Sequence, residues 1–383
     1  MNTENIRKAF KDIFETEPTL FKSPGRINII GEHTDYNGGF VLPAAIDKAI
    51  YVAISKREDD QIHLYAESYS SKSISLVSDI KKTEDAWANY ILGVANQLVE
   101  RGHKISGFNL YLCGEVPLGA GLSSSAAVEC AVAIALKDIN ELTIAPMELA
   151  LISQKAEHTF AGVNCGIMDQ FASVFGKKDK AMLLDCKSLA YEYIPLELEG
   201  YKLVLFNTNV KHSLGDSAYN KRRQQCEQGV QWIKEHHPDV ELLRDVTLAM
   251  LNEHVKQKDE EVYLKCKYVV EEIERVRQAV IALKNGNLSK LGKLMYETHE
   301  GLSSLYEVSC NELDFLVENV KKLDFVLGAR MMGGGFGGCT INIVKNEEVD
   351  NLVKTLEDLY FDKFNLKLEA YVVETGNGSE KIN

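Results

Sequence analysis

The chain carries, at residues 116–127, the stretch Val116-Pro117-Leu118-Gly119-Ala120-Gly121-Leu122-Ser123-Ser124-Ser125-Ala126-Ala127. Its glycines let the backbone approach a ligand closely and turn successive N–H groups toward it. Its serines open an alanine-rich segment that we expect to be a helix, and the free N–H groups and dipole at a helix N-terminus favour an anion. Serine hydroxyls can also bind phosphate oxygens or Mg²⁺. The stretch predicts a phosphate site, although a flexible loop with a serine N-cap has the same pattern.

This loop differs from two common nucleotide-binding loops. No lysine follows its glycines as in G-x-x-x-x-G-K-[ST], and the chain has no H-R-D or D-F-G of a protein kinase. A second glycine cluster, at residues 333–338, contains G-x-G-x-x-G but precedes a strand-like run, whereas a dinucleotide fingerprint follows a strand and opens a helix. We therefore reject a dinucleotide fold. We expect this glycine cluster to be held against another loop or a ligand, with a plain turn as the alternative.

Outward from the loop, hydrophobic periodicity predicts an α+β protein in two lobes. The division lies near residues 190–215, which gives an N-terminal lobe of residues 1–200 and a C-terminal lobe of residues 201–383. Strands are predicted at 49–54, 61–66, 73–77, 108–113, 181–186, 190–196, 201–207, 339–344 and 368–373. Helices are predicted at 4–15, 86–100, after Ser125, from Pro146 to about Gly162, and at 217–236, 246–255, 259–285, 287–308 and 311–323, with one more before the last strand.

Composition narrows the partners of the chain. Of 383 residues, 45% are hydrophobic and 26% charged, with a formal net charge of -13. Such an acidic balance argues against a general nucleic-acid or anionic-membrane surface. The eight cysteines are scattered without a C-x-x-C pair, which favours free thiols over disulfides or zinc. With no signal-peptide core near Met1 and no apolar run long enough for a membrane span, we expect a cytoplasmic protein.

A polar segment near the N-terminus is the second candidate site. Residues 23–39 place Arg26, Glu32, His33, Thr34 and Asp35 among glycine turns. Sugar hydroxyls both donate and accept hydrogen bonds, and fixed carboxylates and imidazoles bind such hydroxyls with geometric discrimination. A metal site is the competing interpretation, but one histidine beside two carboxylates has no distinctive ligand spacing. The third interpretation of this segment is an ordinary charged surface turn.

Two further carboxylates, those of Asp169 and Glu157, are candidate site residues. Asp169 precedes the apolar segment 171–175, and a helix N-terminus there would keep the carboxylate ionised, as a base requires. Most aspartates at such positions only cap a helix. Glu157 lies near the end of the preceding predicted helix, where a solvated charge is more common than a metal ligand.

Taken together, these segments resemble the galactokinase family of the GHMP small-molecule kinases. Residues 24–37 are similar to the galactokinase signature almost residue for residue, and residues 119–127 resemble the phosphate loop of the superfamily. Residues 332–338 resemble its third, glycine-rich motif, while residues 165–170 and 216–220 also match the galactokinase pattern. The resemblance implies a ribosomal-S5-like N-terminal lobe and a ferredoxin-like C-terminal lobe with the site between them. It also implies a kinase that phosphorylates galactose at O1 with ATP, the first step of galactose catabolism. We expect the chain to act as a monomer.

The resemblance also implies a role for each matching residue. Asp169 would accept the proton of the O1 hydroxyl, and Arg26 would stabilise charge on the transferring group. Glu32, His33, Thr34 and Asp35 would bind the sugar, with Tyr219 and the backbone of Gly166 closing around it. Ser125 and Glu157 would hold Mg²⁺. The ATP phosphates would lie on Gly119, Ala120, Gly121, Leu122, Ser123, Ser124 and Ser125.

Two rival functions remain at this point. A related kinase could act on N-acetylgalactosamine or another monosaccharide, because one pocket residue decides whether a 2-acetamido group fits. A sugar sensor could bind galactose and ATP without turnover. The complete run Ser123 to Ala127 favours catalysis, because sensors are expected to have lost residues from it.

Overall fold

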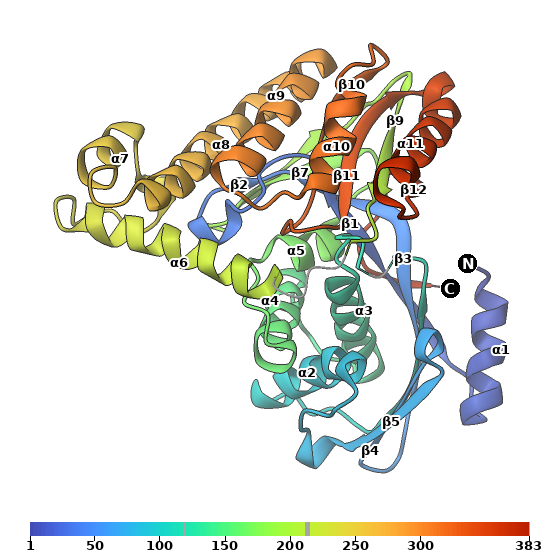
Figure 1. Cartoon of the computed structure of the whole chain (residues 1–383). Coiled ribbons are helices and arrows are strands. Elements are labelled where there is room, and N and C mark those ends of the chain that lie inside the picture. The colour runs from blue at the N-terminus through green and yellow to red at the C-terminus, as the bar shows by residue number, and fades with distance from the viewer. Residues whose placement is uncertain (118, 211–214, 383) are drawn as a thin grey trace.

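The computed structural model of the chain describes residues 1–117, 119–210 and 215–382 (Figure 1). Leu118 of the phosphate loop therefore lies outside the described residues. The N-terminal half is built on a six-stranded sheet with the strand order β13-β1-β3-β6-β4-β5. Neighbouring strands are antiparallel, except the parallel pair β4 and β6. The strands are β1 (Thr19–Asn28), β3 (Pro43–Lys56), β4 (Gln61–Ala66), β5 (Ser71–Leu76), β6 (Phe108–Gly114) and β13 (Glu380–Ile382).

Alternation along the central strands gives this sheet two covered faces. Phe21, Val52 and Leu112 point into a large apolar core shared with the helices that pack behind the sheet. Their chain neighbours Leu20, Ala53 and Tyr111 point to the opposite face, which the N-terminal helix covers. Figure 1 shows that helix on the side of the sheet away from the others. The helices are α1 (Thr3–Phe14) on one face and α2 (Ala86–Glu100), α3 (Ser124–Ile139), α4 (Pro146–Ala156) and α5 (Met168–Phe175) on the other.

The C-terminal half contains a four-stranded antiparallel sheet with the order β10-β11-β9-β12. Its strands are β9 (Tyr201–Asn207), β10 (Val326–Met331), β11 (Cys339–Lys345) and β12 (Glu369–Val373). The helices α9 (Leu288–Glu300), α10 (Asn311–Val320) and α11 (Val349–Phe364) pack around the sheet, and α6 (Gly215–Lys234), α7 (Leu248–His254) and α8 (Glu260–Lys284) extend beside it with an apolar cluster of their own (Figure 1). A small sheet of β2 (Phe40–Val41), β7 (Lys180–Asp185) and β8 (Tyr191–Pro195) completes the described strands.

The observed elements confirm most of the expected helices and strands and correct several. The helices expected to reach residues 162 and 308 end their α-helical part at Ala156 and Glu300, and each continues as one π-helical turn. Strands β1, β2, β10 and β13 were not predicted. The division at residue 200 stays a prediction, and the last described residues return to pair with β1 of the N-terminal sheet.

All eight cysteines are free, and three of them, Cys165, Cys186 and Cys310, are only partly buried. Over the described ranges, no helix has both the length and the apolar character that crossing a bilayer requires.

Candidate active site

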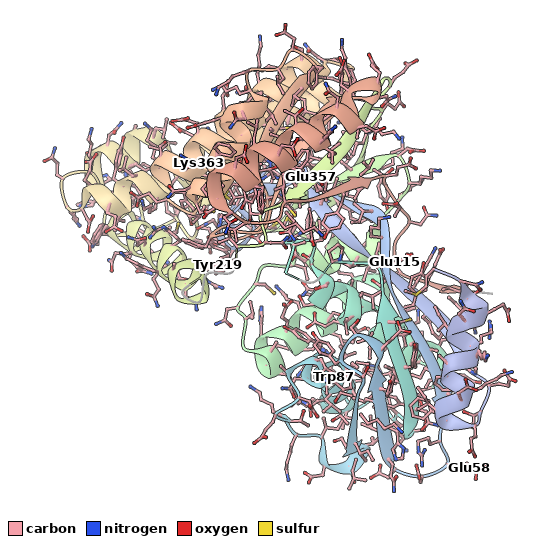
Figure 2. The ribbon with its side chains drawn as sticks, turned by 45° about the vertical axis from the view of Figure 1, so that its right-hand side comes forward. Glu58, Trp87, Glu115, Tyr219, Glu357 and Lys363 are labelled. Carbon is pink, nitrogen blue, oxygen red and sulfur yellow. The ribbon has the colours of Figure 1, made fainter. Side chains whose placement is uncertain are left out.

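A cavity of about 600 Å³ lies where the two halves meet, and it takes its lining from both. Cavities of this size suit small-molecule ligands. Figure 2 shows Tyr219, at the start of α6, at this junction. The lining includes Arg26, Glu32, His33, Asp35, Gly119, Gly121, Glu157, Gly166, Asp169, Tyr219 and the glycine cluster 333–338. The structure thus brings together segments from near the start of the chain, at Arg26, and near its end, at the glycine cluster 333–338.

An ion pair between Arg26 and Asp169 lies in this cavity. The Nε and Nη2 atoms of Arg26 donate to the two oxygens of Asp169 at 2.8 and 3.0 Å, and Nη1 donates to the carbonyl of Gly121 at 2.5 Å. The register of β1 shifts between Pro24 and Arg26, so the arginine stands at a bulge that reorients its side chain. Asp169 stands in the first turn of α5, as expected. The pair therefore connects the phosphate loop, β1 and α5.

The phosphate loop surrounds this pair. Gly119, Gly121 and Ser123 all have positive φ angles of 73, 71 and 55°, so the loop turns sharply just before α3 begins at Ser124. The Ser123 side chain makes no capping bond to that helix; its hydroxyl instead donates to Asp169. Ala120 and Leu122 bury their side chains in the core, so only their backbone faces a ligand. Ser124 is half-buried.

The two glycine clusters of the sequence lie close against each other in the cavity lining. A Cβ atom on Gly121 would lie 3.5 Å from the carbonyl oxygen of Met332, and one on Gly333 would lie 3.7 Å from that of Gly121. A Cβ on Gly335 would collide with the carbonyl oxygen of Val308, and its φ is +88°. The expectation that the second cluster is held against another loop is confirmed.

Ser125 and Glu157 are in contact. The serine hydroxyl donates to Oε1 of Glu157 at 3.0 Å, while Gln170 donates to Oε2 at 2.6 Å and the Cys165 thiol donates to Oε2 at 3.3 Å. Gln170 also donates to the fully buried Glu129 at 3.1 Å. Burial, together with the negative charge of Asp169, raises the pKa of Glu157. Within the described residues, no group of three or more His, Cys, Asp or Glu side chains is placed to hold a metal ion.

The sugar-type residues line the other part of the cavity. Oε1 of Glu32 accepts hydrogen bonds from Arg330 and from the N–H of Gly333, both at 3.0 Å. The buried His33 has a φ of +64° and bonds through Nδ1 to Tyr36 at 2.7 Å, while its buried Nε2 has no partner among the described residues. Burial lowers the pKa of His33 to about 4, so the imidazole is neutral near pH 7. A neutral ring can exchange a hydrogen bond with a hydroxyl at Nε2.

Asp35 faces Gly166. A Cβ atom on Gly166 would overlap the Asp35 carboxylate, so any other residue at position 166 would force that carboxylate to move. Burial and then the charge of Asp169 raise the pKa of Asp35 to about 6. Tyr219 closes over His33, with ring centroids 5.4 Å apart. The side chains of Asp216 and Ser217, in the matching segment, lie outside the described part of the chain.

Thr34 does not fit its expected role as a sugar ligand. Its side chain is fully buried, and the hydroxyl donates to the carbonyls of Gly31 and Phe40 at 2.9 and 2.6 Å. It is also absent from the cavity lining. These two carbonyls shape the turn that carries Glu32 and His33, so we assign Thr34 a structural role.

Sequence reasoning did not identify the buried partners of these side chains. Arg330 donates a hydrogen bond to Glu32, and Gln170 donates one to Glu157. Gln170 also donates to Glu129. Tyr306 lies 4.8 Å from His33, ring to ring, and bonds to Tyr36 at 2.9 Å. Glu129 follows the phosphate loop by one helical turn, and Gln170 adjoins Asp169, so their position beside motif residues was the available signal.

Comparison with known families gives three matches along the chain. Residues 8–56 match the galactokinase galactose-binding signature, residues 89–177 the N-terminal domain of GHMP kinases, and residues 279–360 their C-terminal domain. The galactokinases of Fusobacterium nucleatum and Clostridium perfringens strain ATCC 13124 are each 43% identical to the chain. These alignments cover 99% of both sequences in the first case and 100% in the second.

Solved structures give the same picture. The crystal structure of Lactococcus lactis galactokinase complexed with galactose has a TM-score of 0.95 and 36% sequence identity, covering 99% of this chain and 100% of that one. The mevalonate kinase of Methanococcus jannaschii shares the fold, with a TM-score of 0.67 at 20% identity over 94% of this chain and 99% of its own.

Proposed function

The chain belongs to the galactokinase family of GHMP kinases, and we propose that its interlobe cavity is where the γ-phosphoryl group of ATP passes to O1 of galactose. Its function is that of these relatives, ATP-dependent phosphorylation of galactose, and its fold is the two-lobed GHMP kinase fold that the sequence implied. The observation that carries the proposal is the Arg26–Asp169 pair, which stands between the phosphate loop and the sugar-type residues.

Asp169 is proposed to accept the proton of the O1 hydroxyl while O1 bonds to the γ-phosphorus and ADP leaves with the bridging oxygen. Arg26 donates to both carboxylate oxygens of Asp169 and so fixes the direction of that carboxylate. Orientation is the main requirement here, because in a loose phosphoryl-transfer transition state the nucleophile needs orientation more than early deprotonation. The guanidinium also lies where it can stabilise negative charge on the transferring group.

The sugar is proposed to lie against Glu32, His33 and Asp35. Within the described residues no group donates to Oε2 of Glu32, and Nε2 of His33 is likewise unpartnered, so both remain for sugar hydroxyls. Asp35 adds a hydrogen-bond acceptor beside the backbone of Gly166. Tyr219, whose ring packs on that of His33, is proposed to cover the sugar. Each sugar hydroxyl that loses water in this pocket needs such a replacement, which is how the pocket discriminates among epimers.

The ATP phosphates are proposed to lie on the backbone of Gly119 to Ser125 at the N-terminus of α3. Ser125 and Glu157 would hold Mg²⁺, directly or through water, and the ion would neutralise phosphate charge. The local chemistry suits a cation, because Ser125 and Glu157 bring two oxygen atoms together, and the negative charge of Asp169 adds to the burial that raises the pKa of Glu157. Oxygen donors of this kind are those that Mg²⁺ prefers.

The working state is proposed to be a cytoplasmic monomer. Eight free cysteines suit a reducing compartment, and both halves of one chain line the cavity.

A panel of monosaccharides tests the sugar assignment. We expect ATP consumption with galactose and formation of galactose 1-phosphate, identified by ³¹P NMR. Turnover of N-acetylgalactosamine without turnover of galactose would instead indicate the related kinase. Calorimetric binding of galactose and ATP without ADP formation would indicate a sensor.

A further inference from the structure

Arg330 is a charged side chain in a place that solvent does not reach. It lies on β10, its exposure is 0%, and it is the largest of the fully buried side chains in the described residues. Buried arginines need acceptors for their donors, and Arg330 finds four. It donates from Nε to the carbonyl of Ile29 at 2.9 Å, from Nη1 to that of Met331 at 2.5 Å, and from Nη2 to both the Asn28 carbonyl and Oε1 of Glu32.

Through these bonds, a residue of the C-terminal half fixes the position of residues 28–32 in the N-terminal half. Residues 28–33 leave β1 and carry Glu32 and His33 into the cavity. Elements of the C-terminal half contact the same segment at other points. Glu272 on α8 accepts from the N–H of Gly31 at 2.8 Å, and the hydroxyl of Tyr268, also on α8, donates to the carbonyl of Glu32 at 3.1 Å.

The carboxylate of Glu32 is held asymmetrically. Arg330 and the N–H of Gly333, in the glycine cluster, both donate to Oε1. Within the described ranges, Oε2 receives no hydrogen bond. Although burial alone would raise the pKa of Glu32, the charges of Arg330 and Arg26 and the Gly333 N–H hold it below its usual range. The carboxylate is thus ionised, fixed through one oxygen and open through the other.

Stability alone does not explain this arrangement. The desolvation of a buried ion pair offsets much of its attraction, and apolar side chains of similar volume often stabilise such a position equally well. A guanidinium does what an apolar side chain does not: it fixes the direction of a carboxylate through planar, directional donors.

We propose that Arg330 is a positioning residue for sugar recognition, which orients Glu32 so that Oε2 faces a galactose hydroxyl. The inference rests on the proposed role of Glu32 in the sugar pocket. Arg330 itself contacts no substrate in this account. Strand β10 leads directly into the glycine cluster. The same strand therefore positions both the Glu32 carboxylate and the loop that lies against the phosphate loop.

Steady-state kinetics of Arg330→Met is the first test. We expect KM for galactose to rise by roughly 10- to 100-fold, the range for losing a hydrogen bond to a charged group. We expect a smaller change in kcat and little change in KM for ATP. Leu356→Ala is the control, because Leu356 is 1% exposed in a separate apolar cluster of the C-terminal half, so its truncation lowers Tm without contact with Glu32. An unchanged galactose KM in folded Arg330→Met would overturn the proposal.

Arg330→Lys covers the case in which Arg330→Met does not fold. A lysine keeps the buried cation but has one nitrogen for the four acceptors, so we expect a galactose KM between those of wild type and Arg330→Met. A wild-type KM in folded Arg330→Lys would also count against the proposal.

A double-mutant cycle separates positioning from a general structural effect. If Arg330 acts through Glu32, changing Arg330 to Lys or Met in a Glu32→Ala background leaves the galactose KM where Glu32→Ala alone puts it. Additive effects would overturn the proposal. An unchanged KM in Glu32→Ala alone would instead remove Glu32 from the proposed sugar site, which is a different failure.

Discussion

At the scale of single residues, the site depends on carboxylates kept in different states by their surroundings. Arg26 binds both oxygens of Asp169, whereas Asp35 has no such cationic partner among the described residues and carries a pKa of about 6, caused by burial and the charge of Asp169. Glu32 has its pKa lowered by Arg330 and Arg26, which outweigh the effect of burial. The two carboxylates of the proposed sugar pocket, Glu32 and Asp35, therefore respond differently to pH.

Arg26→Ala should lower kcat by roughly 10²- to 10³-fold, the usual loss when a group that stabilises transition-state charge is removed. KM for galactose should change much less, because the interaction strengthens mainly in the transition state. Initial-rate kinetics with each substrate varied measures both. A rise in KM with unchanged kcat would show that Arg26 only binds ground-state substrate.

The pH dependence of kcat/KM for galactose should show an acid limb near pH 6. Ionised Asp35 is the proposed acceptor of a sugar hydroxyl, so protonation below about pH 6 weakens binding. His33 adds no limb there, because burial lowers its pKa to about 4. The limb should disappear in Asp35→Asn, and a limb near 6 that survives in this variant would contradict the assignment.

The raised pKa of Asp35 also determines whether its ionised carboxylate stabilises or destabilises the fold. Its folded-state pKa lies above the ordinary value of 3.8, so the folded protein binds the proton more tightly and gains stability as pH falls from above 6 toward 4. Asp35→Asn should therefore raise Tm at pH 7.5 relative to wild type. Thermal unfolding at pH 7.5 and pH 5 should show this difference shrinking at the lower pH.

At the scale of elements, the site is made by irregularities in otherwise regular structure. The bulge in β1 presents Arg26, a π-helical turn after α4 presents Glu157, and α5 begins one residue before Asp169. Insertions of this kind cost regular hydrogen bonding and are often found at functional sites.

The loop before α5 gives a steric prediction. Gly166→Ala keeps an accessible backbone conformation but places a methyl group on the Asp35 carboxylate, so KM for galactose should rise at least several-fold while KM for ATP stays near wild type. Gly286→Ala is a control outside the cavity. It has open space around the added Cβ and a φ of +64°, so we expect a stability cost of about 1 kcal/mol and no kinetic change. An unchanged galactose KM in Gly166→Ala would exclude Asp35 from the sugar pocket.

Sequence patterns predicted these elements only where the pattern is local. The helix 86–100 was predicted with its observed bounds, because its apolar face repeats over four turns. Pro24 and Gly25 interrupt the alternation of β1, and β13 has three residues, so neither strand has a periodic signal. The site residues that lie within sequence motifs were predicted. The hydrogen bonds from Arg330 to Glu32 and from Gln170 to Glu129 were not, because they depend on packing between distant segments.

At the scale of the whole molecule, the cavity exists because the two halves contact each other at several points and the end of the chain returns to the N-terminal sheet. The segment after β1 is held by α8 and β10, the two glycine clusters lie against each other, and β13 returns to pair with β1. The proposed sugar and phosphate residues, which come from both halves, therefore converge only in the complete fold. The sequence alone implied a site between two lobes through a family resemblance, and no local pattern specified how the lobes meet.

Asp169→Asn shows whether the carboxylate paired with Arg26 takes part in phosphoryl transfer. Galactose binding, measured by calorimetry, should stay within a few-fold of wild type, since the proposed sugar contacts are made by other residues. The rate of galactose 1-phosphate formation should fall by roughly 10²- to 10⁴-fold, the range for a lost general base. A near-normal kcat in folded Asp169→Asn, with galactose still bound, would contradict the account.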